Sequence, residues 1–237
     1  HFKTKLFIPN NIIFHTYSRN NVLFLPVSYF IRNKFRDIYN ITTNVLYQPV
    51  ILENVNHSNS IKKPNNIVNK FNFVYIGSIN KNKNLGSVVL IINRLNQFYK
   101  MNCSLDIYGE GYTKYIYELY TLAKFNLKVH NSYVDDVSGV LQKYNYYISA
   151  SKNEAYGRIL VEARLMGLTV FAPYSGGSIE IGSDIIYYEP DVIDEACNYI
   201  YSSLLKKKSS NCINVNNFSC NRFYTNFCRL TDFFIKT

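Results

Sequence analysis

Residues 146–172 read YYISASKNEAYGRILVEARLMGLTVFA. The stretch begins with a short apolar run at residues 146–150, passes through a polar turn into a segment of helical periodicity at 158–166, and ends with a second apolar run at 169–172. Gly167 follows the helical segment, and glycine is common just after a helix end. Two apolar strands joined by a helix are typical of parallel strands that are buried on both faces. The stretch therefore predicts a β-α-β unit.

The same alternation continues on both sides of this stretch. Further strands are expected at residues 73–77, 104–108, 127–130 and 185–188. Further helices are expected at residues 85–99, 112–123, 137–143, 179–181 and 193–205. This order predicts an α/β fold with a doubly wound, parallel, Rossmann-like sheet. Such sheets bind ligands outside the carboxyl ends of their strands, so the turns after the strands are the places to search for a site.

Composition and charge narrow the class of protein. The chain has 237 residues, of which 47% are hydrophobic, so it can bury a sizeable core. Its formal charge of +10 suits phosphates, nucleic acid or an anionic membrane surface. The sequence shows no apolar run near the roughly 20 residues of a membrane span, no signal-peptide pattern, and no metal-binding pattern among its five cysteines. We expect a cytoplasmic protein with reduced thiols and no metal site.

A polar, turn-rich stretch at residues 58–69 divides the chain into unequal parts. Before it, strands are expected at residues 22–26 and 43–50, with a helix capped by Ser28 between them. Near the end, the aromatic residues of 218–235 recur at helical spacing and predict a closing helix packed on the core. The expected parts are residues 1–65, a ligand-binding domain at 66–210, and the closing helix within 211–237.

The turn after the first expected strand combines small and cationic residues. Gly77 and Ser78 end the strand, and Lys81 and Lys83 follow before the next helix. A turn of small residues that opens a helix binds anions, because free backbone N–H groups and the helix dipole point at it. A solvated basic loop is the alternative for this segment taken alone.

Two carboxylates accompany the turn after residues 146–150. Glu154 lies before the following helix and Glu162 lies within it, so both can face one cleft. Carboxylate oxygens accept paired hydrogen bonds from neighbouring hydroxyls, which suits a sugar or a ribose. Taken alone, the two residues favour ordinary exposed glutamates over a ligand site.

Glycine-rich turns follow two more strands. Gly109 ends the strand at 104–108, and Gly176 and Gly177 follow the strand at 169–172. Such turns let the backbone approach a ligand closely and leave N–H groups free for an oxyanion. Several of these turns at one edge of one sheet indicate a ligand site more strongly than any one of them.

Taken in chain order, these segments resemble the C-terminal, donor-binding half of glycosyltransferase family 4, the group 1 glycosyl transferases, which have the two-lobed GT-B fold. The resemblance runs from about residue 72 to residue 200. It is carried by Gly77 to Lys83-Asn84, Gly109-Glu110-Gly111, residues 129–134, Glu154-(x7)-Glu162, and Gly176-Gly177-Ser178-Ile179-Glu180. The acidic motif in this ordered context is the most specific of these signals.

The resemblance implies a role for each matching residue. The catalytic candidates are Glu154, for hydroxyls of the transferred sugar, and Lys83, for the diphosphate. Glu162 would bind the ribose hydroxyls, and backbone N–H groups near residues 156–157 and Gly177 would support sugar and phosphate. The further donor-binding candidates are Gly77, Ser78, Lys81, Gly109, Tyr133, Tyr156, Gly157, Arg158, Gly176 and Gly177.

The phosphate turn departs from the family pattern at one position. Ser78 stands where the family has an arginine, so one cation of the diphosphate site is missing. Lys81 and Arg158 are the candidates to replace it.

The resemblance implies a retaining glycosyltransferase that moves a sugar from a UDP- or GDP-linked donor to a glycan or a lipid-linked acceptor. No metal ion or cofactor is expected, in agreement with the lack of an Asp-x-Asp pair in the sequence. The alternative is a nucleotide-sugar-binding module without transferase activity of its own. Nucleic acid is not an expected partner because the lysines are scattered, whereas peripheral contact with an acidic membrane surface stays open.

Residues 1–65 resemble the end of the family's acceptor lobe and its crossover to the donor lobe. A full acceptor lobe needs many more residues than these. We therefore expect a truncated remnant of that lobe, in a fragment of a longer protein, in a naturally shortened enzyme, or in a protein whose acceptor side comes from another chain.

Overall fold

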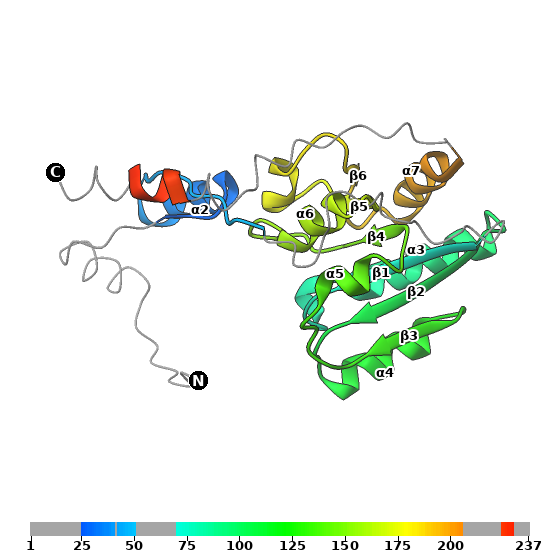
Figure 1. Cartoon of the computed structure of the whole chain (residues 1–237). Coiled ribbons are helices and arrows are strands. Elements are labelled where there is room, and N and C mark those ends of the chain that lie inside the picture. Colours follow the sequence, from blue (N-terminus) through cyan, green and yellow to red (C-terminus); the bar gives the residue numbers. More distant parts are fainter. Residues whose placement is uncertain (1–24, 41, 51–69, 206–223, 230–237) are drawn as a thin grey trace.

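A computed structural model describes residues 25–40, 42–50, 70–205 and 224–229 (Figure 1). Its centre is a parallel six-stranded sheet in the order β3-β2-β1-β4-β5-β6. The strands are β1 (Lys70–Ile76), β2 (Asn102–Tyr108), β3 (Leu127–His130), β4 (Tyr146–Ile148), β5 (Thr169–Pro173) and β6 (Ile186–Tyr188). The predicted doubly wound, Rossmann-like parallel sheet is confirmed.

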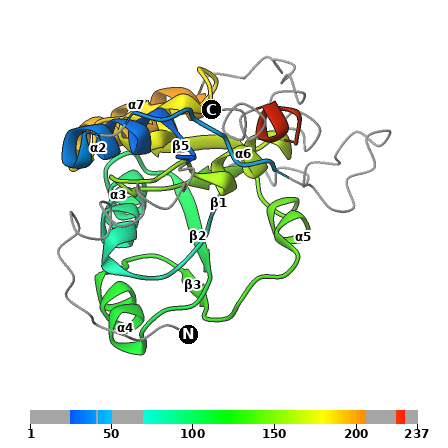
Figure 2. The same ribbon diagram turned by 90° about the vertical axis from the view of Figure 1, so that its left-hand side faces the viewer.

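Helices cover both faces of the sheet. They are α3 (Leu85–Gln97), α4 (Thr113–Leu122), α5 (Val137–Leu141), α6 (Arg158–Leu165) and α7 (Ile193–Leu205). Helices α3, α4 and α7 lie on one face, and α5 and α6 lie on the other (Figure 2). Two 3₁₀ helices, η1 (Lys81–Lys83) and η2 (Gly176–Glu180), occupy the turns after β1 and β5.

The direction of winding reverses between β1 and β4. Strand β1 pairs with β2 along its whole length, and it pairs with β4 at Phe73 and Val74. From β1 the chain continues outward to β2 and β3, whereas from β4 it continues the other way to β5 and β6. The turns after β1 and β4 therefore diverge, and this reversal is where doubly wound sheets form a crevice for ligands.

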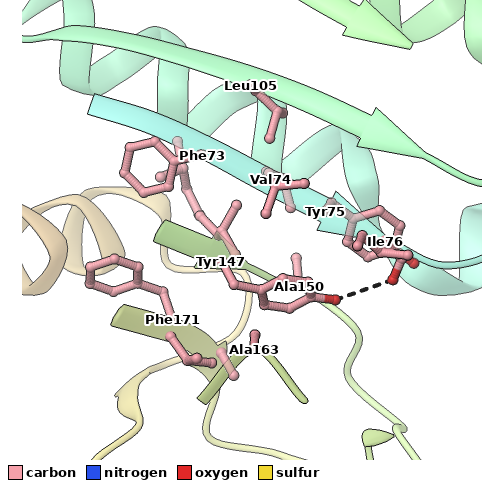
Figure 3. Close-up of a cluster of buried hydrophobic side chains, with 14 of the residues drawn as sticks. Phe73, Val74, Tyr75, Ile76, Leu105, Tyr147, Ala150, Ala163 and Phe171 are labelled. Carbon is pink, nitrogen blue, oxygen red and sulfur yellow. Dashed lines mark hydrogen bonds between the residues drawn. The ribbon is translucent and has the colours of Figure 1, made fainter. Parts of the chain in front are cut away.

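Aromatic and aliphatic side chains fill the space around the central strands (Figure 3). Phe73 on β1 and Phe171 on β5 have no exposed surface, and their ring centroids lie 6.0 Å apart. The buried Tyr147 hydroxyl donates a hydrogen bond to the Ile76 carbonyl at 3.3 Å, which satisfies both polar groups. This packing holds the ends of β1 and β4 together.

Helix α2 (Tyr29–Tyr39) lies beyond the carboxyl ends of the strands (Figure 1). It is the helix predicted from its cap, since the Ser28 hydroxyl accepts a hydrogen bond from the Ile31 N–H at 3.2 Å. The strand predicted at 43–50 is wrong: these residues have no regular secondary structure and pair with no strand of the sheet, and the Leu46 N–H donates to the Pro26 carbonyl at 2.9 Å. The strand predicted at 22–26 lies mostly outside the described residues, and residues 25 and 26 are not in a strand.

The predicted closing helix lies largely outside the described residues. Residues 224–229 do form a helix, but Tyr224 and Phe227 are exposed, so the expected packing on the core is not present in this described part. The predicted boundaries at residues 65 and 210 fall outside the described ranges and stay predictions. Among the described helices, none is both long and apolar enough to span a membrane.

Candidate functional site

A cavity of about 310 Å³ opens between the turns that follow β1 and β4. It therefore lies at the reversal of strand order, where a ligand site is expected. The predicted site residues that line it are Gly77, Ser78, Lys83, Glu154, Tyr156, Gly157 and Arg158.

Lys83 and Glu154, the two catalytic candidates, form an ion pair in this cavity. Lys83 Nζ lies 2.6 Å from Glu154 Oε2, although the residues are 71 positions apart in the sequence. Lys83 ends the 3₁₀ helix η1, where its N–H donates to the Asn80 side chain at 3.2 Å. The side chains are only 27% and 23% exposed, so solvent screens this pair less than a surface pair. A cation and a hydrogen-bond acceptor thus lie together in the cavity.

The β1 turn is supported from behind by the turn after β2. The Gly77 N–H donates to the Tyr108 carbonyl at 2.9 Å. Gly109 has φ +141°, and a Cβ there would lie 1.9 Å from the Gly77 carbonyl oxygen. Gly109 is therefore a packing residue behind the β1 turn, and it does not line the cavity.

The first turn of α6 faces the cavity. Gly157 precedes the helix with φ +91°, and Arg158 to Leu160 are lining residues. A helix N-terminus attracts anions, because its N–H groups and dipole give a positive potential. Arg158 is exposed, and its guanidinium forms no ion pair within the described residues. Lys83 and the first turn of α6 thus bring positive charge to the cavity, and Glu154 brings the negative charge that pairs with Lys83.

Glu162 lies behind the cavity, one helical turn after Arg158 on α6. Its side chain is buried, with 8% exposed, and it is not a lining residue. Burial raises the pKa of the Glu162 carboxyl, and the nearby Arg158 guanidinium partly offsets this rise. The two glutamates of the acidic motif therefore differ: Glu154 is ion-paired in the cavity, whereas Glu162 is buried beside it.

Gly177 does not present a free N–H group as the sequence suggested, and neither Gly176 nor Gly177 lines the cavity. The Gly177 N–H donates to the Glu154 carbonyl at 2.7 Å, so it is already used. A Cβ on Gly177 would lie 2.1 Å from the Ala155 carbonyl oxygen, and one on Gly176 would lie 2.7 Å from that of Glu154. The absence of side chains lets this turn pack directly against the turn that carries Glu154.

Lys81 and Tyr133 lie away from the cavity. Lys81 is 78% exposed and its Nζ lies 3.8 Å from Glu118 Oε2 on α4. Tyr133 is exposed in the turn after β3. Of the two cations considered as replacements for the missing arginine, only Arg158 lines the cavity.

Val27 and Gln48 line the cavity from outside the predicted donor-binding domain, and neither was a predicted site residue. Both reach the cavity from the segment of residues 25–50, which includes α2. Valine and glutamine are not residue types that indicate a ligand site by themselves. The one sequence feature that could have pointed to them is the resemblance of this segment to the family's crossover from the acceptor lobe to the donor lobe. Across the residues that the structure describes, no group of three His, Cys, Asp or Glu side chains could hold a metal ion.

Comparison with known proteins gives a family and several solved structures. The family model for "Glycosyl transferases group 1" matches residues 57–186. No curated protein matches the chain significantly. A glycosyltransferase from Rickettsia africae ESF-5 has a TM-score of 0.72 at 19% identity, covering 97% of this chain and 68% of that one.

Two ligand complexes are also similar in fold. HepE from Anabaena, in complex with UDP and glucose, has a TM-score of 0.64 at 16% identity, covering 78% of this chain and 54% of that one. TarM from S. aureus, in complex with fondaparinux, alpha-GlcNAc-glycerol and UDP, has a TM-score of 0.61 at 16% identity, covering 81% of this chain and 38% of that one. The chain thus spans only part of these longer proteins.

Proposed function

The chain belongs to the group 1 glycosyl transferases, and on that basis we propose that its cavity binds a nucleotide-diphosphate sugar and that the sugar is transferred, with retention, to a glycan or a lipid-linked acceptor. The observation that carries this proposal is the Lys83–Glu154 ion pair at the reversal of strand order. It brings a phosphate-binding cation and a hydroxyl-binding carboxylate to one point of the cavity.

The ion pair suggests where the reacting bond would lie. A nucleotide sugar has an anionic diphosphate on one side of its glycosidic bond and a ring of hydroxyls on the other. Lys83 suits the first part and Glu154 suits the second. Because Nζ and Oε2 are 2.6 Å apart, a donor bound to both would have its sugar–phosphate bond beside the pair.

Stabilisation of the leaving group is the chemistry that these residues support. Negative charge develops on the diphosphate as the bond to the sugar breaks. Lys83, Arg158 and the first turn of α6 all place positive potential at the cavity, and groups aimed at developing charge raise turnover. In this proposal Glu154 anchors sugar hydroxyls, and neither a metal ion nor a cofactor takes part.

The nucleotide is proposed to extend from the cavity toward Glu162, whose carboxylate would accept hydrogen bonds from the ribose. UDP is the first nucleotide to test, because the Anabaena and S. aureus proteins of similar fold are complexed with UDP. GDP is the second. We place the acceptor site outside the donor-binding part, since the chain spans only 38% to 68% of the three similar structures.

A titration with UDP-, GDP- and ADP-linked hexoses tests donor binding, and assays of donor hydrolysis and transfer, with and without EDTA, test the reaction. Binding with turnover that survives EDTA supports the proposal. Binding without hydrolysis or transfer supports a nucleotide-sugar-binding module instead, and no binding to any donor contradicts both.

The Glu154→Gln variant should bind the nucleotide sugar more weakly than the wild type. The control is Lys114→Ala, a substitution at an exposed position of α4.

A further inference from the structure

Glu180 links the segment of residues 25–50 to the donor-binding domain by hydrogen bonds. Its carboxylate accepts hydrogen bonds from the Tyr29 N–H at 2.9 Å and the Phe30 N–H at 2.8 Å. The Tyr47 hydroxyl donates to the same carboxylate at 2.9 Å. A carboxylate at the N-terminus of α2 is also favoured by the helix dipole. One side chain of η2 thus holds both the start of α2 and the extended residues that follow it.

The same segment packs directly against the turn that carries Glu154. The Ser28 hydroxyl donates a hydrogen bond to the Ala155 carbonyl. The Tyr47 ring lies with its centroid 5.3 Å from that of Tyr156, which is buried and lines the cavity. Contacts from both ends of the segment therefore fix its position relative to Glu154.

Gln48 follows Tyr47 and lines the cavity together with Lys83 and Glu154. Its side chain is exposed and has no hydrogen-bond partner in the described part of the chain. A primary amide offers two donors and one acceptor, which matches sugar hydroxyls. The cavity contains the sugar and diphosphate candidates, whereas the ribose candidate Glu162 is not one of its lining residues. Gln48 therefore shares the cavity with the sugar and diphosphate candidates and not with the ribose candidate.

Resting on the proposed function, we propose that Gln48 binds the transferred sugar and helps to select it, and that Glu180 is a positioning residue that holds Gln48 at the cavity through Tyr47. The segment of residues 25–50 then completes the donor site. Glu180 itself does not line the cavity, so it acts only through the residues that it holds.

The first test measures affinity for UDP-glucose and for UDP, with GDP-mannose and GDP as a second pair. Gln48→Ala should weaken binding of the nucleotide sugar roughly three- to tenfold, as expected for one neutral hydrogen bond, and leave the free nucleotide unchanged. Asn44→Ala, which shortens an exposed amide of the same segment that does not line the cavity, is the matched control.

The second test separates positioning from general stability. Tyr47→Phe keeps the ring against Tyr156 and removes only the hydroxyl bonded to Glu180. It should weaken binding of the nucleotide sugar severalfold, and Glu180→Gln, which replaces one acceptor oxygen by a donor, should weaken it more. Both losses should nearly vanish in a Gln48→Ala background, because contacts that act through one residue are not additive.

The outcomes distinguish this inference from the proposed function. If the wild-type chain binds none of the UDP-, GDP- and ADP-linked hexoses, the proposed function is overturned. If it binds one of them and Gln48→Ala binds it equally well, only the role of Gln48 is overturned. Equal losses for nucleotide sugar and free nucleotide, or a full effect of Tyr47→Phe in the Gln48→Ala background, also overturn the inference.

Discussion

The turns after β1 and β5 have similar sequences but different partners. Both contain small residues, both follow a parallel strand, and both open a short 3₁₀ helix. The β1 turn lines the cavity with Gly77 and Ser78 and supplies Lys83. In the β5 turn, the Gly177 N–H is bonded to the Glu154 carbonyl and Glu180 caps α2. One turn faces the ligand site, and the other holds the protein around it.

The difference shows what decides the role of a glycine-rich turn. A free N–H binds an oxyanion only if no protein carbonyl reaches it first. At both turns a protein carbonyl already satisfies a glycine N–H, that of Tyr108 for Gly77 at 2.9 Å and that of Glu154 for Gly177 at 2.7 Å. The β1 turn thus offers the cavity Lys83 rather than these donors. The neighbours of a turn in space, rather than its glycines, therefore decide whether it binds a ligand.

The largest expected effect is at the turn that faces the cavity. Lys83→Ala removes the cation paired with Glu154, and turnover should fall by roughly 10²- to 10³-fold, the range for losing one preorganised charge-stabilising group. Donor affinity should fall less, because the charge on the leaving group grows in the transition state. Steady-state kinetics with direct binding measurements check this, and Lys114→Ala is the control. A loss of affinity with turnover unchanged would show that Lys83 serves binding alone.

At the β5 turn the expected loss is in stability. Gly177→Ala should lower the free energy of unfolding by roughly 1–3 kcal/mol, as overpacking does, because its Cβ would lie 2.1 Å from the Ala155 carbonyl oxygen. The control is Gly86→Ala in α3, where the nearest atom to the new Cβ is 3.9 Å away and the change should be neutral or stabilising. Urea denaturation measures both. If the two variants unfold alike, the β5 turn is not packed as described.

A smaller effect, of opposite sign, is expected at Glu162. Burial raises the pKa of its carboxyl above the ordinary value of 4.5, so its contribution to stability is full below that pH and is lost as pH rises through the raised pKa. Glu162→Gln should therefore raise the melting temperature slightly at pH 7 and leave it unchanged near pH 4, while weakening donor binding. Thermal unfolding at the two pH values is the measurement. A lower melting temperature at pH 7 would contradict the prediction.

The smallest effect is expected two residues before Lys83. Lys81 belongs to the same 3₁₀ helix, but it points to Glu118 and is mostly exposed. Exposed ion pairs contribute little, so Lys81→Ala should change donor affinity and turnover less than twofold. The same binding and kinetic assays apply. A loss as large as that of Lys83→Ala would instead support a role for Lys81 in binding the proposed diphosphate.

The sequence predicted the sheet and its helices because each element depends on its own apolar run or periodicity. It also placed Lys83 and Glu154 in turns at the carboxyl edge of one sheet, but it did not predict that these two side chains would form an ion pair. The segment 43–50 has the residue types of a strand, yet it pairs with neither edge strand, and its Leu46 N–H and Tyr47 hydroxyl bond to Pro26 and Glu180 instead. The bonds from Glu180 to α2 span about 150 residues and leave no local pattern to predict them.

The pairing of β4 with β1 also sets the order in which the cavity can form. Strand β1 can pair with β2 soon after synthesis, but β4 joins it only after some 70 further residues have left the ribosome. Contacts this distant in the sequence form slowly, because a long loop must close first. A donor that needs both halves of the sheet therefore binds only chains that have completed this step, and by mass action it protects them from unfolding. If the proposed donor binds, it therefore stabilises only chains in which β4 has joined β1.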